Sequence, residues 1–220
     1  MVQRYRARFA ILEPMRFTGH LDLMRTWERT LRRAGLPLAY SGGYHAHPRI
    51  QIGAALPLGC TASAELLDLW LEQELAEGEV GGALQHVLPP GLSLDRLAAL
   101  PSPRRDLQDE IVAGDYTAIP LEFEFPPRLA KDVTGFLASP SVMRERRGRS
   151  YDLRPLVLDL QILPRDHYCS LNLRVRLGEN ATGRPDEVLA CLDLQRFAVR
   201  VNRDRLLLRD ARAGITPSDG

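Results

Sequence analysis

The chain has 220 residues, which is enough for two domains of ordinary size. Its composition, 45% hydrophobic and 26% charged, is that of a globular protein and excludes an intrinsically disordered chain. The net charge of +1 excludes a bulk polycation, so any surface for nucleic acid must be a local patch.

The first hundred residues alternate between strand-like and helix-like patterns. Residues 4–13 alternate basic and apolar side chains, which predicts a strand. Residues 18–35 predict a helix that ends at Gly35, with an apolar stripe of Leu21, Met24, Trp27 and Leu31. The remaining strands are predicted at 49–56, 63–72 and 92–100, with a glycine-weakened helix at 76–89. The predicted order is therefore β-α-β-β-α-β.

The second half repeats this order after residues 101–110, which are polar and bounded by proline, as is typical of a linker. Strands are predicted at 116–125, 154–163, 168–177 and 197–209, and helices at 127–139 and 183–194. We expect an α+β fold of two tandem ferredoxin-like (β-α-β-β-α-β) domains, whose antiparallel sheets are backed by helices. The expected boundaries are 1–100 and 116–209 for the domains, 101–115 for the linker and 210–220 for a flexible tail.

The three cysteines, Cys60, Cys169 and Cys191, are widely separated along the chain. Their odd number argues against a disulfide framework. Without a C-x-x-x-C-x-x-C motif, the chain cannot hold an iron–sulfur cluster in the manner of radical enzymes. The N-terminal residues lack a signal-peptide core, and no run of about 18 apolar residues could span a membrane. We expect a cytoplasmic protein with no cofactor and no membrane association.

Two clusters of arginine are candidates for binding a polyanion. The first occupies one face of the predicted helix, at spacings i, i+4, i+7 and i+8, and consists of Arg25, Arg29, Arg32 and Arg33. The second lies within residues 144–154 and consists of Arg144, Arg146, Arg147, Arg149 and Arg154. The alternatives are a solvated helix face, partly neutralised by Asp22 and Glu28, and a structural pair of Arg154 with Asp152.

Residues 41–59, SGGYHAHPRIQIGAALPLG, match neither a P-loop nor a G-x-G-x-x-G motif. In an extended segment His45 and His47 point to the same side, where His20 could approach them. These three histidines are the candidates for acid–base catalysis and, as an alternative to our expectation of no metal, for zinc. Loop hydrogen bonds are the other interpretation of the histidines. We expect one concave, anion-binding surface formed by His20, Asp22, Arg25, Arg29, Tyr44, His45 and Arg49.

The segment 17–71 resembles the radical-SAM-linked protein family, a bacterial domain of unknown function encoded beside, or fused to, a cobalamin-binding radical SAM protein. The matching positions are His20-Leu21-Asp22, Arg29 to Pro37, Gly43-Tyr44, Pro48, Leu56 to Gly59 and the segment YDLRPLV at 151–157. Departures from the family pattern are Gly19 for serine, Thr30 for alanine and Ala46-His47 for residues of the Asn-Pro type. The resemblance implies an accessory protein whose radical SAM partner supplies the cluster and cofactor, and gene neighbourhoods favour an RNA substrate.

Three functions remain open at this point. The first is an accessory RNA-binding or substrate-presenting partner of a radical SAM enzyme, without catalysis of its own. The second is a metal-independent RNA-cleaving or RNA-modifying enzyme that uses histidine as general acid or base. The third is a protein–protein adaptor whose Arg144, Arg146 and Arg147 meet acidic residues of the partner. Because only 6% of the residues are aromatic, RNA binding would rest mainly on phosphates, with Tyr44, Tyr151 and Tyr168 as stacking candidates.

Overall fold

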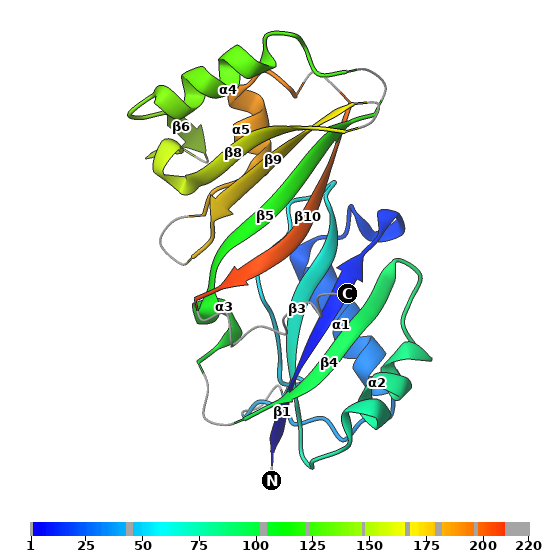
Figure 1. Ribbon diagram of the computed structural model, residues 1–220. Coiled ribbons are helices and arrows are strands. Elements are labelled where there is room, and N and C mark those ends of the chain that lie inside the picture. The colour runs from blue at the N-terminus through cyan, green and yellow to red at the C-terminus, as the bar shows by residue number, and fades with distance from the viewer. Residues whose placement is uncertain are drawn as a thin grey trace.

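The computed structural model describes residues 2–42, 46–101, 105–121, 124–146, 148–165, 168–178, 182–195 and 198–209. It shows a mixed α+β fold in which helices lie behind a large, mostly antiparallel sheet (Figure 1). This confirms the predicted α+β class. None of the helices in the described residues is both long and apolar enough to cross a membrane.

The first unit contains one sheet region backed by two helices. Its elements are β1 (Gln3–Ile11), α1 (His20–Arg33), β2 (Ile50–Ile52), β3 (Thr61–Leu71), α2 (Glu77–Gln85) and β4 (Leu92–Leu100). The strands lie in the order β4-β1-β3-β2, and each neighbouring pair is antiparallel. One detail of the predicted helix stripe is wrong, because Leu21 is 70% exposed and Leu23 is buried in its place.

The second unit repeats this arrangement with an added hairpin. Its elements are β5 (Ile111–Pro120), α4 (Leu129–Ala138), β6 (Met143–Arg146), β7 (Arg149–Asp152), β8 (Val157–Pro164), β9 (Cys169–Arg176), α5 (Pro185–Cys191) and β10 (Val199–Leu208). The main strands lie in the antiparallel order β10-β5-β9-β8. The β6–β7 hairpin forms a separate two-stranded sheet, which the sequence analysis did not predict.

The segment predicted as a linker, 101–115, instead contains ordered secondary structure. Helix α3 (Leu107–Glu110) lies within it, and β5 begins at Ile111 rather than at residue 116. Leu107 and Glu110 are both buried, the former in the core and the latter in an ion pair with Arg6. The prediction of a linker, made from the polar composition, was therefore wrong, because the Glu110 carboxylate is paired inside the protein rather than solvated.

The two units share one continuous sheet rather than forming two separate sheets. Strand β10 runs parallel to β3 at two residue pairs, Asn202 with Thr61 and Arg203 with Ala62. We call this β3–β10 pairing the seam. Strand β2 pairs with the same edge of β3 further along, at Leu67–Leu69. The seam thus occupies only the first residues of β3.

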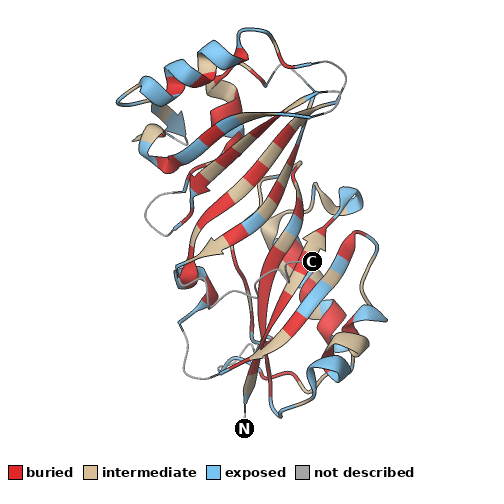
Figure 2. Ribbon diagram, in the orientation of Figure 1, coloured by how far each residue is buried: buried red, intermediate tan, exposed pale blue. Residues whose placement is uncertain are grey.

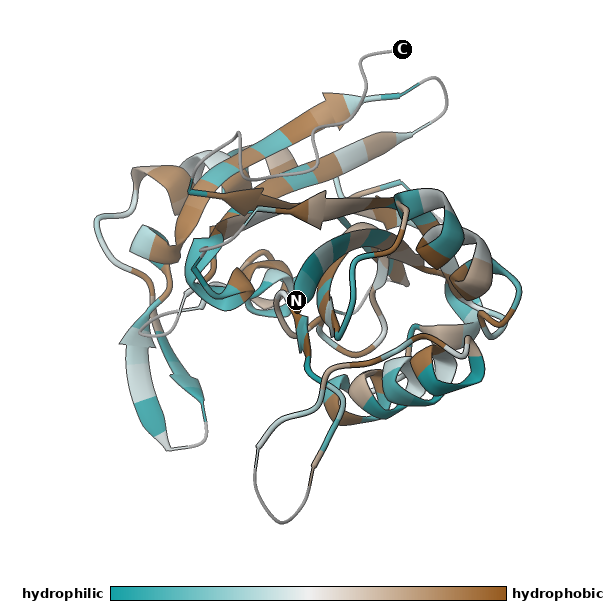
Figure 3. Ribbon diagram, turned by 90° about the horizontal axis from the view of Figure 1, so that it is seen from below, coloured by the Kyte–Doolittle hydropathy of each residue, from teal (hydrophilic) through white to brown (hydrophobic). Residues whose placement is uncertain are grey.

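Each unit has its own hydrophobic core between the sheet and its helices (Figure 2). In the first, Trp27 of α1 packs edge-on against Phe9 of β1, with ring centroids 4.9 Å apart. In the second core, Leu171, Leu173 and Val175 of β9 are buried and alternate with more exposed polar residues of the same strand. Seen from below, the helices lie on one side of the sheet and alternate hydrophilic with hydrophobic residues (Figure 3).

Candidate functional site

The exposed face of α1 carries the first predicted arginine cluster. Buried Leu23, Trp27 and Leu31 recur at helical spacing and fix the orientation of the helix on the sheet. The opposite face is therefore solvent-exposed, and it carries Arg25, Arg29, Arg32 and Arg33. The structure thus places these four side chains on one surface.

The charge of this face is only partly neutralised. Arg25 donates to Asp22 at 3.2 Å in a solvent-exposed pair, and Arg33 donates to the carbonyl of Val87 at 3.0 Å. Within the described residues, Arg29 and Arg32 make no ion pair with an acidic side chain. Because surface pairs contribute little, the face presents a net positive charge to solvent.

The loop between α1 and β2 packs at the C-terminal end of β3. The amide of Ala39 donates to the carbonyl of Trp70, and the amide of Trp70 donates to the carbonyl of Arg49. The Arg49 guanidinium carbon lies 4.6 Å from the centroid of the Trp70 ring, a cation–π contact. Two predicted members of the loop site, Tyr44 and His45, lie outside the described residues.

The structure does not bring His20 together with His47 or Arg49. His20 begins α1, whereas the His47 Nδ1 atom lies 3.9 Å from Glu28, eight residues further along the helix. That separation corresponds to about 12 Å along the axis at ~1.5 Å per residue. The described residues contain no group of three or more potential metal ligands. Neither the shared concave surface nor the zinc alternative therefore gains support from the described part of the loop.

His20 has the most unusual environment among the described histidines. Its Nδ1 atom is buried and has no hydrogen-bond partner within the described residues. Burial lowers the pKa of His20, and the nearby positive charge of Arg203 lowers it further. His20 is thus neutral at pH 7, because protonation would place a positive charge in a partly buried site near Arg203.

The second predicted arginine cluster lies on the β6–β7 hairpin. Arg144 donates to Glu187 of α5 at 2.8 Å, and this hydrogen bond raises the pKa of Arg144. Arg146 and Arg149 are exposed, and Arg147 lies outside the described residues. The hairpin therefore contributes two exposed cations in addition to one paired arginine.

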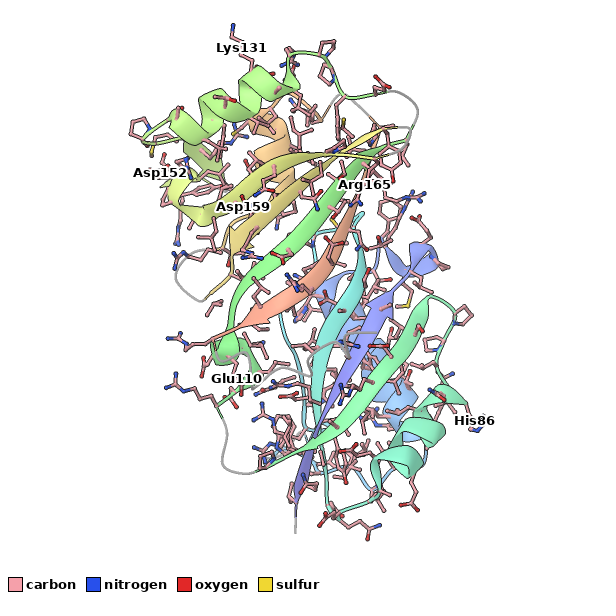
Figure 4. The ribbon with its side chains drawn as sticks, viewed as in Figure 1. His86, Glu110, Lys131, Asp152, Asp159 and Arg165 are labelled. Carbon is pink, nitrogen blue, oxygen red and sulfur yellow. The ribbon has the colours of Figure 1, made fainter. Side chains whose placement is uncertain are left out.

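Arg154 has a structural role rather than a surface one. Its guanidinium donates to the carbonyls of Leu137 and Val157, both at 3.1 Å. Asp152, at the end of the hairpin in Figure 4, accepts from the amides of Val142 and Arg154. These bonds lower the pKa of Asp152, the Val142 amide having the larger effect. The expected Arg154–Asp152 pairing thus runs through the backbone amide and not through the guanidinium.

A buried ion pair joins the two units at the seam. Arg203 of β10 donates from Nε to Glu65 of β3 at 2.6 Å, and from Nη1 to the Tyr116 hydroxyl at 3.2 Å. Its remaining N–H groups donate to the second Glu65 carboxylate oxygen and to the carbonyls of Ala54 and Ala55. Burial opposes the charge of Arg203, but Glu65 and Tyr116 together outweigh burial and raise the Arg203 pKa. The Arg203–Glu65 pair could not be predicted from local sequence patterns, because its partners are 138 residues apart.

A second buried ionic cluster connects β1 with β3 and α3. Arg6 donates from Nε to Asp68 at 2.7 Å and from Nη1 to Glu110 at 2.8 Å, and Arg4 also pairs with Asp68. Glu110 is labelled in Figure 4 at the α3 end of this cluster. The alternation of basic and apolar residues in β1 was noticed in the sequence, but it did not reveal that the basic side chains are buried.

The open face of the sheet carries a row of polar side chains that crosses the seam. Asn202 bonds with Ser63 on β3 and Asp204 on its own strand, and Asp204 accepts from Thr117 on β5. Asn172 of β9 in turn donates to Thr117 at 3.1 Å. These side chains make the open face polar from β3 to β9.

Asp115 lies on the same open face and pairs with two arginines. Arg174 donates to it at 2.6 Å and Arg205 at 2.8 Å. Burial alone would raise the pKa of Asp115, but the two arginines outweigh burial and lower it. Asp115 therefore carries its negative charge at neutral pH.

These features define an α+β protein with a largely antiparallel sheet, paired charges inside and arginine-rich helix and hairpin surfaces. The model of a family described as uncharacterized protein conserved in bacteria (DUF2344) matches residues 4–185, and the chain belongs to this family. A comparison with the curated proteins finds no match. Among solved structures, one assigned as a glycine cleavage system transcriptional repressor is similar at 12% identity, over 93% of this chain and 99% of that chain. Its TM-score of 0.27 is too low to carry a structural argument.

Proposed function

We propose that the protein is an RNA-binding accessory protein that presents RNA to a partner enzyme and has no catalysis of its own. The observation that carries the proposal is the exposed arginine face of α1, on which Arg29 and Arg32 make no ion pair within the described residues. Guanidinium groups bind phosphates in bidentate fashion, and phosphate contacts dominate sequence-independent affinity.

The strand orders support a finer description of the fold, as two ferredoxin-like units. If the four main strands of each unit are numbered along the chain, their order across the sheet is 4-1-3-2 in both units. That antiparallel arrangement, with two helices on one face, is that of the β-α-β-β-α-β fold. Sheets of this kind commonly serve RNA recognition, and this analogy favours the proposal.

The partner that we propose is a radical SAM enzyme, and this rests on the resemblance of residues 17–71. One segment that carries the resemblance, 56–59, is anchored just before another, 20–22, because the Gly59 amide donates to the carbonyl of Arg16 at 2.7 Å. A hydrolytic role for histidine has less support, because His20 and His47 lie apart. An adaptor role for the hairpin is weakened by the pairing of Arg144 with Glu187.

The test is the salt dependence of RNA affinity, measured by fluorescence anisotropy with a labelled single-stranded RNA of mixed sequence. The variant Arg29→Glu/Arg32→Glu should bind RNA more weakly. Each phosphate contact contributes ~0.7 to the steepness of log affinity against log salt, so the loss of two contacts should reduce that steepness by about 1.4.

The matched control is Lys131→Glu/Arg176→Glu, which makes the same change in net charge. Lys131 lies on α4, in the other unit from α1 (Figure 4), and both residues are exposed. An equal loss of affinity in the control, or flat affinity of the wild type across salt, would refute the proposal.

A further inference from the structure

A cleft of about 540 Å³ opens beside the seam. Its walls are the end of β1, the start of β3 and the start of β10, with Leu12 and Pro14 supplying apolar surface and Ser63, Arg200 and Asn202 supplying polar groups. This volume and this mixture of an apolar wall with a few polar groups are those of small-ligand sites.

The polar side of the cleft is held in one orientation by hydrogen bonds. Thr61 donates to the Asn202 Oδ1 atom at 2.8 Å, and the Asn202 Nδ2 atom donates to the Ser63 hydroxyl at 2.9 Å. Ser63 therefore accepts from Asn202 and keeps its own proton for a ligand. Since Ser63 is exposed, its hydroxyl is accessible from solvent.

Two guanidinium groups flank one carboxylate at the rim. Glu13 accepts from Arg16 at 2.8 Å and from Arg200 at 3.0 Å, each through a different oxygen atom. The local charge of these three groups is +1, and each arginine has N–H groups that these pairs do not use. Such an arrangement favours an anion and is suited to a phosphate.

An exposed aromatic ring lies next to this rim. Phe17 is 68% exposed, and the Arg16 guanidinium carbon lies 4.7 Å from its ring centroid. A Cβ atom placed on Gly59, two residues before Thr61, would lie 3.5 Å from the Phe17 ring. Exposure of a phenylalanine is costly, and an aromatic face beside arginine provides a platform for a nucleobase.

We propose that this cleft takes one nucleotide of a single-stranded RNA, an inference that rests on the proposed function. The base stacks on Phe17, Arg16 and Arg200 hold the phosphate, and the Ser63 hydroxyl donates to the base or ribose. Sequence-specific RNA recognition uses splayed bases in this way. The cleft would therefore supply base contacts, whereas the face of α1 supplies phosphate contacts.

The test combines two probes, the four nucleoside 5′-monophosphates by saturation-transfer NMR and a labelled single-stranded RNA by fluorescence anisotropy. Phe17→Ala should abolish mononucleotide binding and weaken RNA binding by about 5- to 150-fold, the range for one stacked base. Ser63→Trp should do the same by filling the cleft. Both positions are exposed, so melting curves should match the wild type. The control is Leu158→Ala, which removes another exposed apolar side chain, 45% accessible and on β8 in the other unit.

The outcomes separate the two proposals. If Arg29→Glu/Arg32→Glu loses RNA but retains mononucleotides, both are supported. If the wild type binds RNA and the two cleft variants bind it equally well, the cleft proposal is overturned and the proposed function stands. If mononucleotides bind but RNA does not, both proposals are overturned, and the cleft is a site for a free nucleotide. If neither probe binds and Phe17→Ala abolishes co-purification of a protein partner, Phe17 belongs to a protein-docking site and both proposals are overturned.

Discussion

Replacing Arg203 by methionine should strongly destabilise the protein. The guanidinium is fully buried, and all five of its N–H groups are directed at acceptors: two at Glu65, one at Tyr116 and two at the carbonyls of Ala54 and Ala55. Methionine fills much of the same volume but offers none of these donors. The Glu65 carboxylate would then be buried without a counter-charge.

The expected cost follows from that uncompensated charge. Breaking a buried ion pair by removing one partner costs about 3–5 kcal/mol, a large part of the ~5–15 kcal/mol that stabilises a typical native protein. For a chain of this size, about 2–4 °C in Tm accompanies each kcal/mol, so we expect a fall of about 6–20 °C. The double variant Glu65→Gln/Arg203→Met should recover part of this loss, because no charge is left buried.

Urea denaturation followed by circular dichroism gives the free energies of unfolding. The control is Arg205→Met, on the same strand, whose exposed pair with Asp115 should contribute less than about 1 kcal/mol. Loosening the seam should also separate the unfolding of the two cores, which would appear as a second transition. If Arg203→Met costs no more than Arg205→Met, the ion pair does not hold the seam and the reasoning is wrong.

Three further predictions concern local packing and titration. Gly183→Ala should cost about 1–3 kcal/mol in urea denaturation, because its Cβ would lie 2.8 Å from Val175 and 2.9 Å from a backbone carbonyl. Gly81→Ala, in helix α2 with no atom within 4 Å, should instead stabilise by up to about 1 kcal/mol. Burial and Arg203 lower the pKa of His20, so His20 takes up a proton more readily in the unfolded state, and stability falls as the pH drops below about 6.5. The variant His20→Asn should therefore reduce the difference in Tm between pH 7.5 and pH 5.5. An unchanged difference would contradict this. Burial raises the Cys60 pKa to about 11, so mass spectrometry should find Cys60 the slowest cysteine alkylated at pH 8, and faster labelling than at Cys191 would contradict its burial.

The order of the main strands and helices could be predicted from the sequence because it depends on local periodicity, whereas α3 and the β6–β7 hairpin were not predicted. The strand predicted at 92–100 has the same bounds as β4. The start of β5 could not be predicted, because α3 is polar and buries Glu110 only through Arg6, 104 residues away. A contact at that separation has no signature in a window of ten or twenty residues.

The same distinction applies to the candidate site. The exposure of the α1 arginines follows from helical spacing, so it could be predicted without a structure. The loop before β2 could not be placed, because its position depends on hydrogen bonds with Trp70 and on the stacking of Arg49. Phe17 lies between Arg16 and Thr18 just before the helix, and only the structure shows that its ring is exposed.

The shortness of the seam explains why a buried ion pair lies where the two cores meet. The β3–β10 pairing comprises only two residue pairs, a short contact for two units of this size. Arg203 adds bonds to β3, β5 and the loop at 54–55, so a single side chain fixes three segments against one another. Its neighbour Asn202 points to the open face, where it lines the cleft with Ser63. The cleft is built from both units, and its shape therefore depends on their relative position. A nucleotide held there would contact Arg200 from one unit and Phe17 from the other, and the buried pair beneath maintains that spacing.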